Sequence, residues 1–284
     1  MYKEADLPLN DRGAVYHLDL LPEEIADTII TVGDPARVNE VSKHFDSIDV
    51  VRSHREFLTH TGFFNGKPMS VLSTGIGLPN IDIVINELDA LANIDLKTRM
   101  PKEKHRSFKI IRLGTTGGLQ EAVQPGDIIV SRYAVGFDTL LTYYQQAPSP
   151  SLINLNSSLK HFLGENSGPF YVTESDNLLF ELLKPIGAPG ITATCCGFYA
   201  PQGRALRLPI AYPGLIDNLV DFEFDGLPFT NLEMETAGIL GLGKIFNHQC
   251  ASASVVLANR YNGTFSGQVG RHVEQLFQKA LELF

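Results

Sequence analysis

Six short apolar runs, separated by stretches with helical periodicity, constrain the fold of this chain more than any other feature. The runs are 28–33, 69–75, 108–114, 126–135, 190–198 and 251–260. Three of them end at glycine or lead into a glycine-rich turn. Apolar residues recur at helical spacing in 80–91, 233–246 and 270–284. Strands that alternate with helices predict an α/β fold around a mixed or mainly parallel sheet.

No linker separates these segments, so we expect one domain over residues 1–284. Two stretches have the character of insertions. The segment 95–107 is charged and lies between a predicted helix and a predicted strand, and 143–151 is a loop rich in proline and serine. Because ligands bind at the carboxyl ends of strands in an open α/β sheet, the segments that follow the strands are where a site is expected.

Charge and cysteine content exclude several classes of function. A net charge of -9 disfavours nucleic acid and membrane surfaces as partners, and an anionic substrate would need local arginines. The N-terminus lacks a signal-peptide pattern, and no apolar run reaches the roughly 18 residues that span a bilayer. Three cysteines, two of them adjacent, argue against a disulfide framework and predict a reducing, cytoplasmic location. Scattered histidines without CxxC or HExxH give little support for a transition-metal site.

Two segments at predicted strand ends have the residues of an oxyanion site. In GDPARV, Gly33 permits close approach of a ligand and Arg37 lies in the first turn of a helix. In RLGTTGG, Arg112 precedes a glycine-rich turn in which Thr115 adds a hydroxyl. An arginine in an apolar strand indicates a charged partner or ligand, because burying an unpaired charge is costly. Plain strand-to-helix turns are the alternative for both segments.

Two further segments contribute charged groups. SHREF contains Arg55 and Glu56, for which a solvated surface is the alternative. NLEMETAG places Glu233 and Glu235 around Met234 at the start of a predicted helix. These carboxylates suit either the helix dipole or the hydroxyls of a sugar whose apolar face packs on the methionine.

The segment GFYAPQGR combines an aromatic ring, an amide and a guanidinium in Phe198, Gln202 and Arg204. Such a set can bind a flat polar ring, although a core phenylalanine and a surface arginine would also account for it. Each of these motifs is weak alone. In the order YHLDL, GDPARV, SHREF, STGIG, RLGTTGGL, GFYAPQGR and NLEMETAG they resemble the nucleoside phosphorylase-I family, specifically its uridine phosphorylase branch, from His17 to Asn259.

The resemblance implies a fold and a reaction. The fold is a single-domain three-layer sandwich around a mixed central β-sheet. The reaction is the reversible phosphorolysis of uridine to uracil and ribose 1-phosphate, with inorganic phosphate as co-substrate and no organic cofactor. Some relatives bind potassium at a dimer interface, and Glu56 and Ser73 match the residues that hold it.

The resemblance also implies roles for individual residues. The implied phosphate site comprises Gly33, Arg37, Arg55, Arg112 and Thr115. The implied ribose site comprises His17, Glu233, Met234 and Glu235. The implied base site comprises Phe198, Gln202 and Arg204. The implied catalytic set is Arg112, Gln202, Arg204 and Glu235. Arg55 and His17 would reach the site from a partner subunit, which implies at least a homodimer, and some family members are hexamers built as three dimers.

The base site has a chemical rationale in this resemblance. Uracil presents O2, N3–H and O4 along one edge, so Gln202 can accept from N3–H and donate to O2 while Arg204 donates to O4. Phe198 would cover the ring face. No covalent intermediate is required, so Cys195 and Cys196 are expected to be buried strand residues rather than nucleophiles.

Alternatives stay open at this point. Purine-specific relatives carry an aspartate near the position of Asn259, which weakens but does not remove a purine nucleoside phosphorylase on the same fold. A nucleosidase that uses water and a nucleoside-binding protein without turnover are the other two. Pro201 precedes Gln202 where many relatives have glycine, so the shape of the base loop can differ.

Overall fold

The computed structural model describes residues 1–164 and 168–284. The strands in this part of the chain are β1 (Thr28–Val32), β2 (Ser47–His54), β3 (Phe57–Phe64), β4 (Lys67–Ser73), β5 (Ile94–Asp95), β6 (Met100–Pro101), β7 (Lys109–Gly118), β8 (Ile128–Phe137), β9 (Tyr171–Glu174), β10 (Ala188–Cys195), β11 (Glu223–Phe224), β12 (Leu227–Glu233), β13 (Gln249–Asn259) and β14 (Thr264–Phe265). The helices are α1 (Pro35–Ser42), α2 (Leu78–Asn93), α3 (Pro150–Leu163), α4 (Asn177–Leu183), α5 (Leu215–Asn218), α6 (Thr236–Ile245) and α7 (Val269–Leu281).

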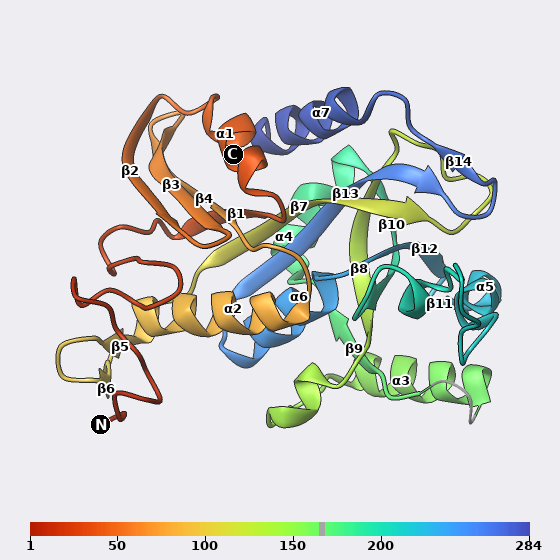
Figure 1. The fold of residues 1–284 in the computed structure, drawn as a ribbon, viewed down its shortest axis with the longest axis horizontal. Coiled ribbons are helices and arrows are strands. Elements are labelled where there is room, and N and C mark those ends of the chain that lie inside the picture. The colour runs from red at the N-terminus through yellow and green to blue at the C-terminus, as the bar shows by residue number, and fades with distance from the viewer. Residues whose placement is uncertain (165–167) are drawn as a thin grey trace.

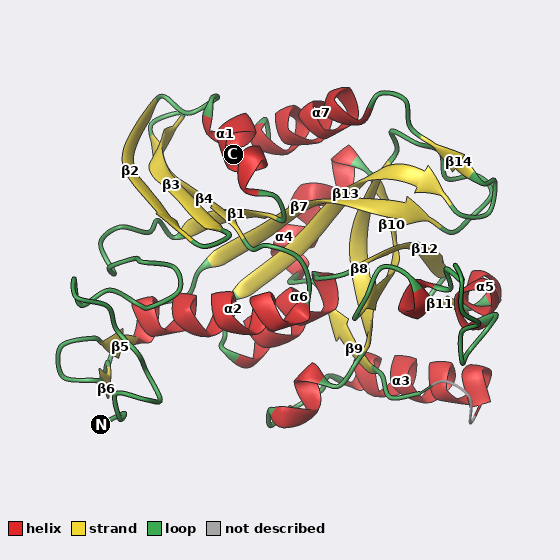
Figure 2. Ribbon diagram, in the orientation of Figure 1, coloured by secondary structure: helices red, strands yellow, loops and turns green. Residues whose placement is uncertain are grey.

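Most of the strands belong to one mixed sheet with helices on both faces (Figure 1). Its order is β11-β12-β10-β8-β13-β7-β1-β4-β3-β2, with β9 beside β8 and β14 beside β13. Helices α2 and α6 lie on one side of the sheet, and α1 and α7 lie on the other (Figure 2). Helices α2 and α6 share one apolar cluster, and α1, α4 and α7 pack in another. The predicted α/β fold with a mixed central sheet is therefore confirmed. None of the described helices is long and apolar enough to cross a membrane.

The local patterns of the sequence predict many of these elements. All six apolar runs form strands, namely β1, β4, β7, β8, β10 and β13. The segments with helical periodicity form α2, α6 and α7. In α7 the buried residues Val273, Leu276, Phe277 and Ala280 follow the helical repeat, so this helix buries one apolar stripe.

Some predicted boundaries are wrong, and two of them concern the motifs RLGTTGG and NLEMETAG. The segment from Gly114 to Gly118 is not a turn, because β7 continues through it and pairs with β13 up to Asn259. Helix α6 begins at Thr236 rather than at Glu233, which is the last residue of β12. Strand pairing, which the local sequence does not reveal, extends both strands.

The two insertion-like segments are more ordered than expected. The charged segment 95–107 contains the short hairpin β5–β6, and Lys102 Nζ donates to the carbonyls of Leu91 and Ala92 at the end of α2, each at 3.0 Å. The loop 143–151 ends inside a helix, because Ser149 caps α3. The hairpin β2–β3, which contains SHREF, is a further element that apolar periodicity did not predict.

The sheet closes on itself at one end. Strand β12 pairs in parallel with β10 and also, in antiparallel fashion, with β7. Since β10 pairs with β8, β8 with β13 and β13 with β7, five strands form a closed ring. The closure occurs where Asn231 lies opposite Gly118 and Leu232 opposite Gly117, so it brings the carboxyl-terminal ends of β12 and β7 together.

A polar network centred on Asn231 links strands of the ring. Asn231 Nδ2 donates to Thr116 Oγ1 at 2.9 Å, and its Oδ1 accepts from Thr192 Oγ1 at 3.0 Å and from Thr230 Oγ1 at 2.9 Å. Thr192 Oγ1 in turn lies 2.6 Å from Ser131 Oγ. All of these groups are buried, so each depends on the others for its hydrogen bonds.

Replacing Asn231 by leucine, which is similar in size, should destabilise the protein by about 3 kcal/mol, since several buried hydroxyls lose a partner. Urea denaturation measures the free energy of unfolding. The control is Asn154→Ala on the exposed face of α3, for which a change below about 0.5 kcal/mol is expected. If Asn231→Leu is as stable as Asn154→Ala, the network around Asn231 does not stabilise the fold.

Candidate active site

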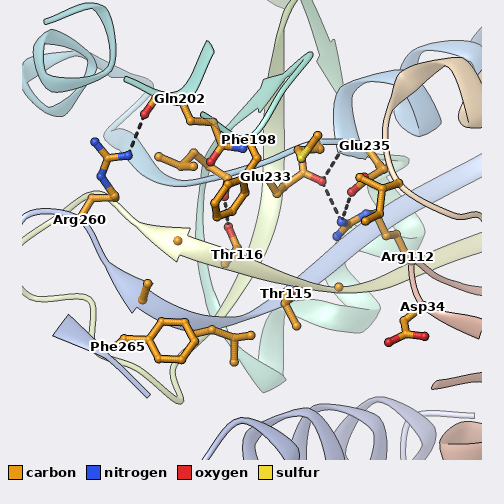
Figure 3. A pocket seen from close by; sticks show the side chains of 18 of the residues that line it. Asp34, Arg112, Thr115, Thr116, Phe198, Gln202, Glu233, Glu235, Arg260 and Phe265 are labelled. Atoms are coloured by element: carbon orange, nitrogen blue, oxygen red, sulfur yellow. Dashed lines mark hydrogen bonds and ion pairs between the residues drawn. The ribbon is translucent and has the colours of Figure 1, made fainter. Parts of the chain in front are cut away.

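A cavity of about 1010 Å³ lies beside the ends of β1, β7, β12 and β13 (Figure 3). The residues predicted for phosphate, ribose and base that line it are Gly33, Arg37, Arg112, Thr115, Phe198, Gln202, Arg204, Glu233, Met234 and Glu235. Glu56 also lines it. His17, Arg55 and Ser73 are predicted site residues that do not. Its size is at the upper end of what small-molecule sites have.

A buried charge cluster forms part of the wall of this cavity. Arg112 Nη2 lies 2.6 Å from Glu235 Oε2 and 3.0 Å from Glu233 Oε2, and Arg112 Nη1 donates to Ser254 Oγ at 3.0 Å. Burial opposes the charge on Arg112, but the two carboxylates outweigh it and raise the pKa of the guanidinium. Burial, with the carboxylate of Glu233 nearby, raises the pKa of Glu235 in spite of Arg112.

The backbone holds both carboxylates in place. Glu233 accepts from the N–H groups of Glu235 and Thr236, each at 2.9 Å, and therefore stabilises the positive end of α6. Thr194 Oγ1 donates to Glu233 at 2.6 Å. Glu235 uses its second oxygen to accept from the N–H of Gly77 at 2.7 Å, just before α2. Each carboxylate oxygen keeps spare lone pairs, so Glu235 can still accept hydrogen bonds from a bound hydroxyl.

Gly114 provides the space in which the Arg112 guanidinium lies. A Cβ atom at Gly114 would lie 1.7 Å from Arg112 Nη1 and 2.4 Å from its Cζ, which no real contact permits. The guanidinium is held by the two glutamates and Ser254, so it cannot move aside without losing those bonds. The glycine of RLGT therefore positions the arginine.

The oxyanion end of the cavity is formed at the start of α1. Gly33 and Thr115 lie on its wall, and Asp34 caps the helix by accepting from the N–H of Ala36 at 2.9 Å. Arg37 lines the same wall, and burial together with the nearby Arg112 lowers its pKa. An anion bound there would relieve the repulsion between the two guanidiniums.

The residues of GFYAPQGR hold one another at the other end of the cavity. The Arg204 guanidinium lies 3.9 Å from the centre of the Phe198 ring and donates to the Phe198 carbonyl at 2.6 Å. Arg204 also donates to Gln202 Oε1, which leaves the amide nitrogen of this buried glutamine for a ligand. The structure thus brings the three predicted base residues together, with Phe198 half-exposed.

Sequence reasoning missed Arg260 and misjudged one cysteine. Arg260 lines the cavity and donates to the Gln202 carbonyl at 2.7 Å, and together with burial it lowers the pKa of Arg204. Its place as the last residue of the apolar run 251–260 was the signal that could have found it. Cys195 is buried as predicted, whereas Cys196 is exposed because β10 ends at Cys195.

The side chain of Asn259 is fully engaged in structure. Its amide nitrogen donates to the carbonyls of Gln120 and Val123, and its oxygen accepts from the N–H of Asn262 at 2.7 Å. Although Asn259 lines the cavity, it has no N–H left for a ligand and no carboxyl group. Asn259 therefore cannot donate a proton to a ligand.

The arginine of SHREF does not line the cavity of its own chain. Arg55 occupies the turn between β2 and β3 with φ +55°, a conformation that is uncommon for a residue other than glycine. Its guanidinium lies 5.9 Å from the ring centre of Tyr16, next to His17 in sequence. Tyr16 is partly exposed, so these residues form a surface patch rather than part of the pocket.

The charges that line the cavity balance. The four guanidiniums are those of Arg37, Arg112, Arg204 and Arg260. The four carboxylates are those of Asp34, Glu56, Glu233 and Glu235. Because these charges cancel, a dianionic ligand would leave the site with excess negative charge unless a further cation joined it.

No cluster of three or more His, Cys, Asp or Glu side chains among the described residues could hold a metal ion.

Comparison with known proteins gives consistent matches. The model of the phosphorylase superfamily matches residues 27–284. A uridine phosphorylase of Thermococcus kodakarensis is 31% identical over 272 residues, which cover 95% of this chain and 86% of that protein. A DeoD-type purine nucleoside phosphorylase of Listeria monocytogenes is 33% identical over 250 residues, which cover 87% and 88%. A nucleoside phosphorylase structure from Trypanosoma brucei, reported to show uridine phosphorylase activity, has a TM-score of 0.90 and 29% identity, covering 98% of this chain and 99% of that one.

Gly114→Ala should cost about 3 kcal/mol in the free energy of unfolding at pH 7.5, because the displaced Arg112 leaves two buried carboxylates uncompensated. The control is Gly270→Ala in α7, where a Cβ would meet nothing within 4 Å, so its stability should be equal or slightly higher. Urea denaturation at fixed pH compares the three proteins. If Gly114→Ala is as stable as wild type, the Arg112 guanidinium does not depend on the space that Gly114 leaves.

The deficit of Gly114→Ala should also shrink as the pH falls towards 4.5, the ordinary pKa of glutamate. Burial already raises the pKa of Glu235, and loss of its arginine partner raises it further. The native variant then binds more protons than native wild type, so it gains stability relative to wild type on acidification.

Proposed function

This chain belongs to the phosphorylase superfamily, and we propose that it catalyses the reversible phosphorolysis of uridine to uracil and ribose 1-phosphate. One observation carries the proposal: a single cavity joins an oxyanion end, a pair of carboxylates and an amide–guanidinium pair. The T. kodakarensis and T. brucei proteins, to which this chain is similar, are a uridine phosphorylase and a nucleoside phosphorylase with uridine phosphorylase activity. Pyrimidine salvage and nucleoside catabolism in the cytoplasm are the setting we propose.

Phosphate would bind between the start of α1 and β7. Gly33, Thr115 and the guanidiniums of Arg37 and Arg112 line that end of the cavity. Helix N-termini and arginines favour oxyanions, and the low polarity of a buried site strengthens each contact.

Ribose would lie over Met234 with its hydroxyls on Glu235, between phosphate and base. As the glycosidic bond lengthens, the sugar gains oxocarbenium character, and phosphate beside it supplies the compensating negative charge. Arg112 bonds to Glu235 at 2.6 Å, so the group that holds the sugar and a group that holds phosphate share one rigid cluster. That arrangement fixes the distance between the reacting partners.

The base would lie against Phe198 and Gln202. Uracil departs as an anion whose negative charge is on its oxygens. Arg204, with Arg260 behind the Gln202 carbonyl, provides positive charge at that end of the cavity. These donors bind the departing anion more strongly than the neutral base, so they stabilise the transition state more than the ground state. No residue needs to act as a nucleophile.

The active unit we propose is at least a homodimer, with a hexamer of three dimers as the larger form known in the family. The charge balance of the cavity supports it, since a phosphate dianion requires a further cation. Arg55 does not line its own cavity, and its guanidinium lies near the Tyr16 ring, from where it would reach a second copy. In the dimer, Arg55 would contact phosphate and His17 the 5′-hydroxyl of the partner's substrate.

Potassium at Glu56 and Ser73 stays a prediction. Ser73 Oγ donates to the Glu56 carbonyl at 2.7 Å, so the two oxygen-bearing residues lie together, and oxygen ligands suit a hard cation. The reaction proposed above draws on no such ion.

A purine nucleoside phosphorylase is the second candidate, because the L. monocytogenes enzyme matches at similar identity. Asn259 argues against it, since both of its amide hydrogens are engaged with backbone carbonyls. A nucleosidase would not need the oxyanion end of the cavity, and a binding protein would not need the charge cluster beside the sugar.

Turnover of uridine and of inosine, each with and without phosphate, tests the function by ultraviolet absorbance. We expect loss of uridine only when phosphate is present, and little loss of inosine. Gln202→Ala should lower kcat/KM for uridine on the order of 10- to 100-fold through lost hydrogen bonds to the base, with the KM for phosphate unchanged.

Gln278→Ala, at an exposed position of α7, is the matched control and should behave as wild type. Preferential inosine turnover would move the enzyme to the purine branch. Hydrolysis without phosphate would make it a nucleosidase, and no turnover would leave a binding protein.

A mixed dimer tests the shared site. One chain carries Arg55→Ala and the other Glu235→Gln, with different affinity tags, and the tagged heterodimer is purified. One of its two sites then has both an intact Glu235 and an intact Arg55, so about half of the wild-type activity should return, while either variant homodimer is nearly inactive. A mixed dimer as inactive as the homodimers would rule out sharing.

A further inference from the structure

Glu87, in the middle of α2, holds the segment that contains His17. Its carboxylate is buried, and it accepts from the backbone N–H of His17 at 3.0 Å and from that of Leu18 at 2.8 Å. Its Oε1 also lies 2.6 Å from Nδ1 of the His17 ring. One carboxylate therefore holds both the backbone of this short segment and the ring of His17.

These contacts determine the tautomer of His17. Both oxygens of Glu87 already accept from backbone N–H groups, so they act as acceptors towards the ring as well. Nδ1 must therefore carry a proton, so in the neutral imidazole Nε2 is the acceptor left for a ligand. A carboxylate on one nitrogen also makes the other nitrogen a stronger acceptor, as in carboxylate–histidine pairs behind metal ions.

Neighbouring groups hold the ring in this orientation. The Tyr16 ring packs edge-on against His17 with 5.1 Å between ring centres, and edge-on against His54 at 5.8 Å. His54 Nδ1 in turn lies 3.1 Å from the His17 carbonyl. The His17 side chain nevertheless stays 26% exposed, so it is both oriented and accessible.

We propose that Glu87 is a positioning residue that presents His17 Nε2 as the acceptor for the 5′-hydroxyl of a nucleoside bound to a second copy of the chain. The inference rests on the proposed function and on the shared site. It makes Glu87 a determinant of specificity for nucleosides with a free 5′-hydroxyl, although Glu87 itself does not line the cavity.

The substitution Glu87→Gln keeps the size and packing of the side chain but replaces one of its two acceptor oxygens by an N–H donor. Its single carbonyl oxygen is needed by the two backbone N–H groups, so its amide N–H faces Nδ1 and shifts the proton of His17 to Nε2. Compared with wild type, kcat/KM for uridine should fall about tenfold, while kcat/KM for 5′-deoxyuridine, which lacks the hydroxyl, should change less than about twofold.

Two variants serve as controls. Asp82→Asn removes another partly buried carboxylate of α2, which bonds to Asn86 and Tyr144, and should leave the ratio of the two substrates unchanged. His17→Ala should lower the preference for uridine over 5′-deoxyuridine, and adding Glu87→Gln to it should lower that preference no further. Histidine ¹⁵N NMR should show His17 protonated at Nδ1 in wild type and at Nε2 in Glu87→Gln.

An equal fall for both nucleosides in Glu87→Gln would overturn the proposal and leave Glu87 a structural residue. An unchanged His17 tautomer would overturn it as well. If wild type consumes uridine but His17→Ala keeps the full preference, the contact with the 5′-hydroxyl is wrong while the proposed function stands. If wild type consumes neither nucleoside, the proposed function fails and this inference fails with it.

Discussion

The buried arginine between two glutamates is the constraint on which the rest of this structure depends. Arg112 comes from β7, Glu233 from the end of β12 and Glu235 from the residue before α6. Ions removed from water must have partners in good geometry, because an isolated buried charge costs several kcal/mol. The three elements therefore cannot separate without exposing a charge or leaving it unpaired, and the same cluster lines the cavity.

Closure of the five-stranded ring makes that cluster possible. Arg112 and Glu233 meet because β12 crosses from β10 to pair with β7. The Asn231 network links the strands just behind the cluster, and Gly114 leaves room for the guanidinium. Inside the ring, hydrogen bonds between polar groups hold the strands together, as apolar packing does elsewhere in the core. They also fix the positions of the strands more strictly, because each hydrogen bond has a direction.

Helix α2 connects two functions that the proposed dimer would place in different active sites. The N–H of Gly77, just before its first turn, bonds to Glu235 in the cavity of the same chain. Further along the helix, Glu87 bonds to His17, which does not line that cavity. In the proposed dimer, the cavity of one copy, whose lining charges sum to zero, would receive the Arg55 guanidinium and the His17 imidazole of the other.

The sequence by itself determined the fold class, the six strands with continuous apolar runs and the helices α2 and α7, which follow from local periodicity. Its motifs at strand ends, and their resemblance to the phosphorylase family, identified the candidate site residues. Tertiary structure alone decided that GTTGG is a strand, that Glu233 ends β12, and that Arg260 lies behind Gln202. It also decided which motif residues face the cavity and which, like Arg55, lie on the surface. Strand extension, ring closure and charge pairing depend on partners distant in sequence, and local patterns carry no information about those partners.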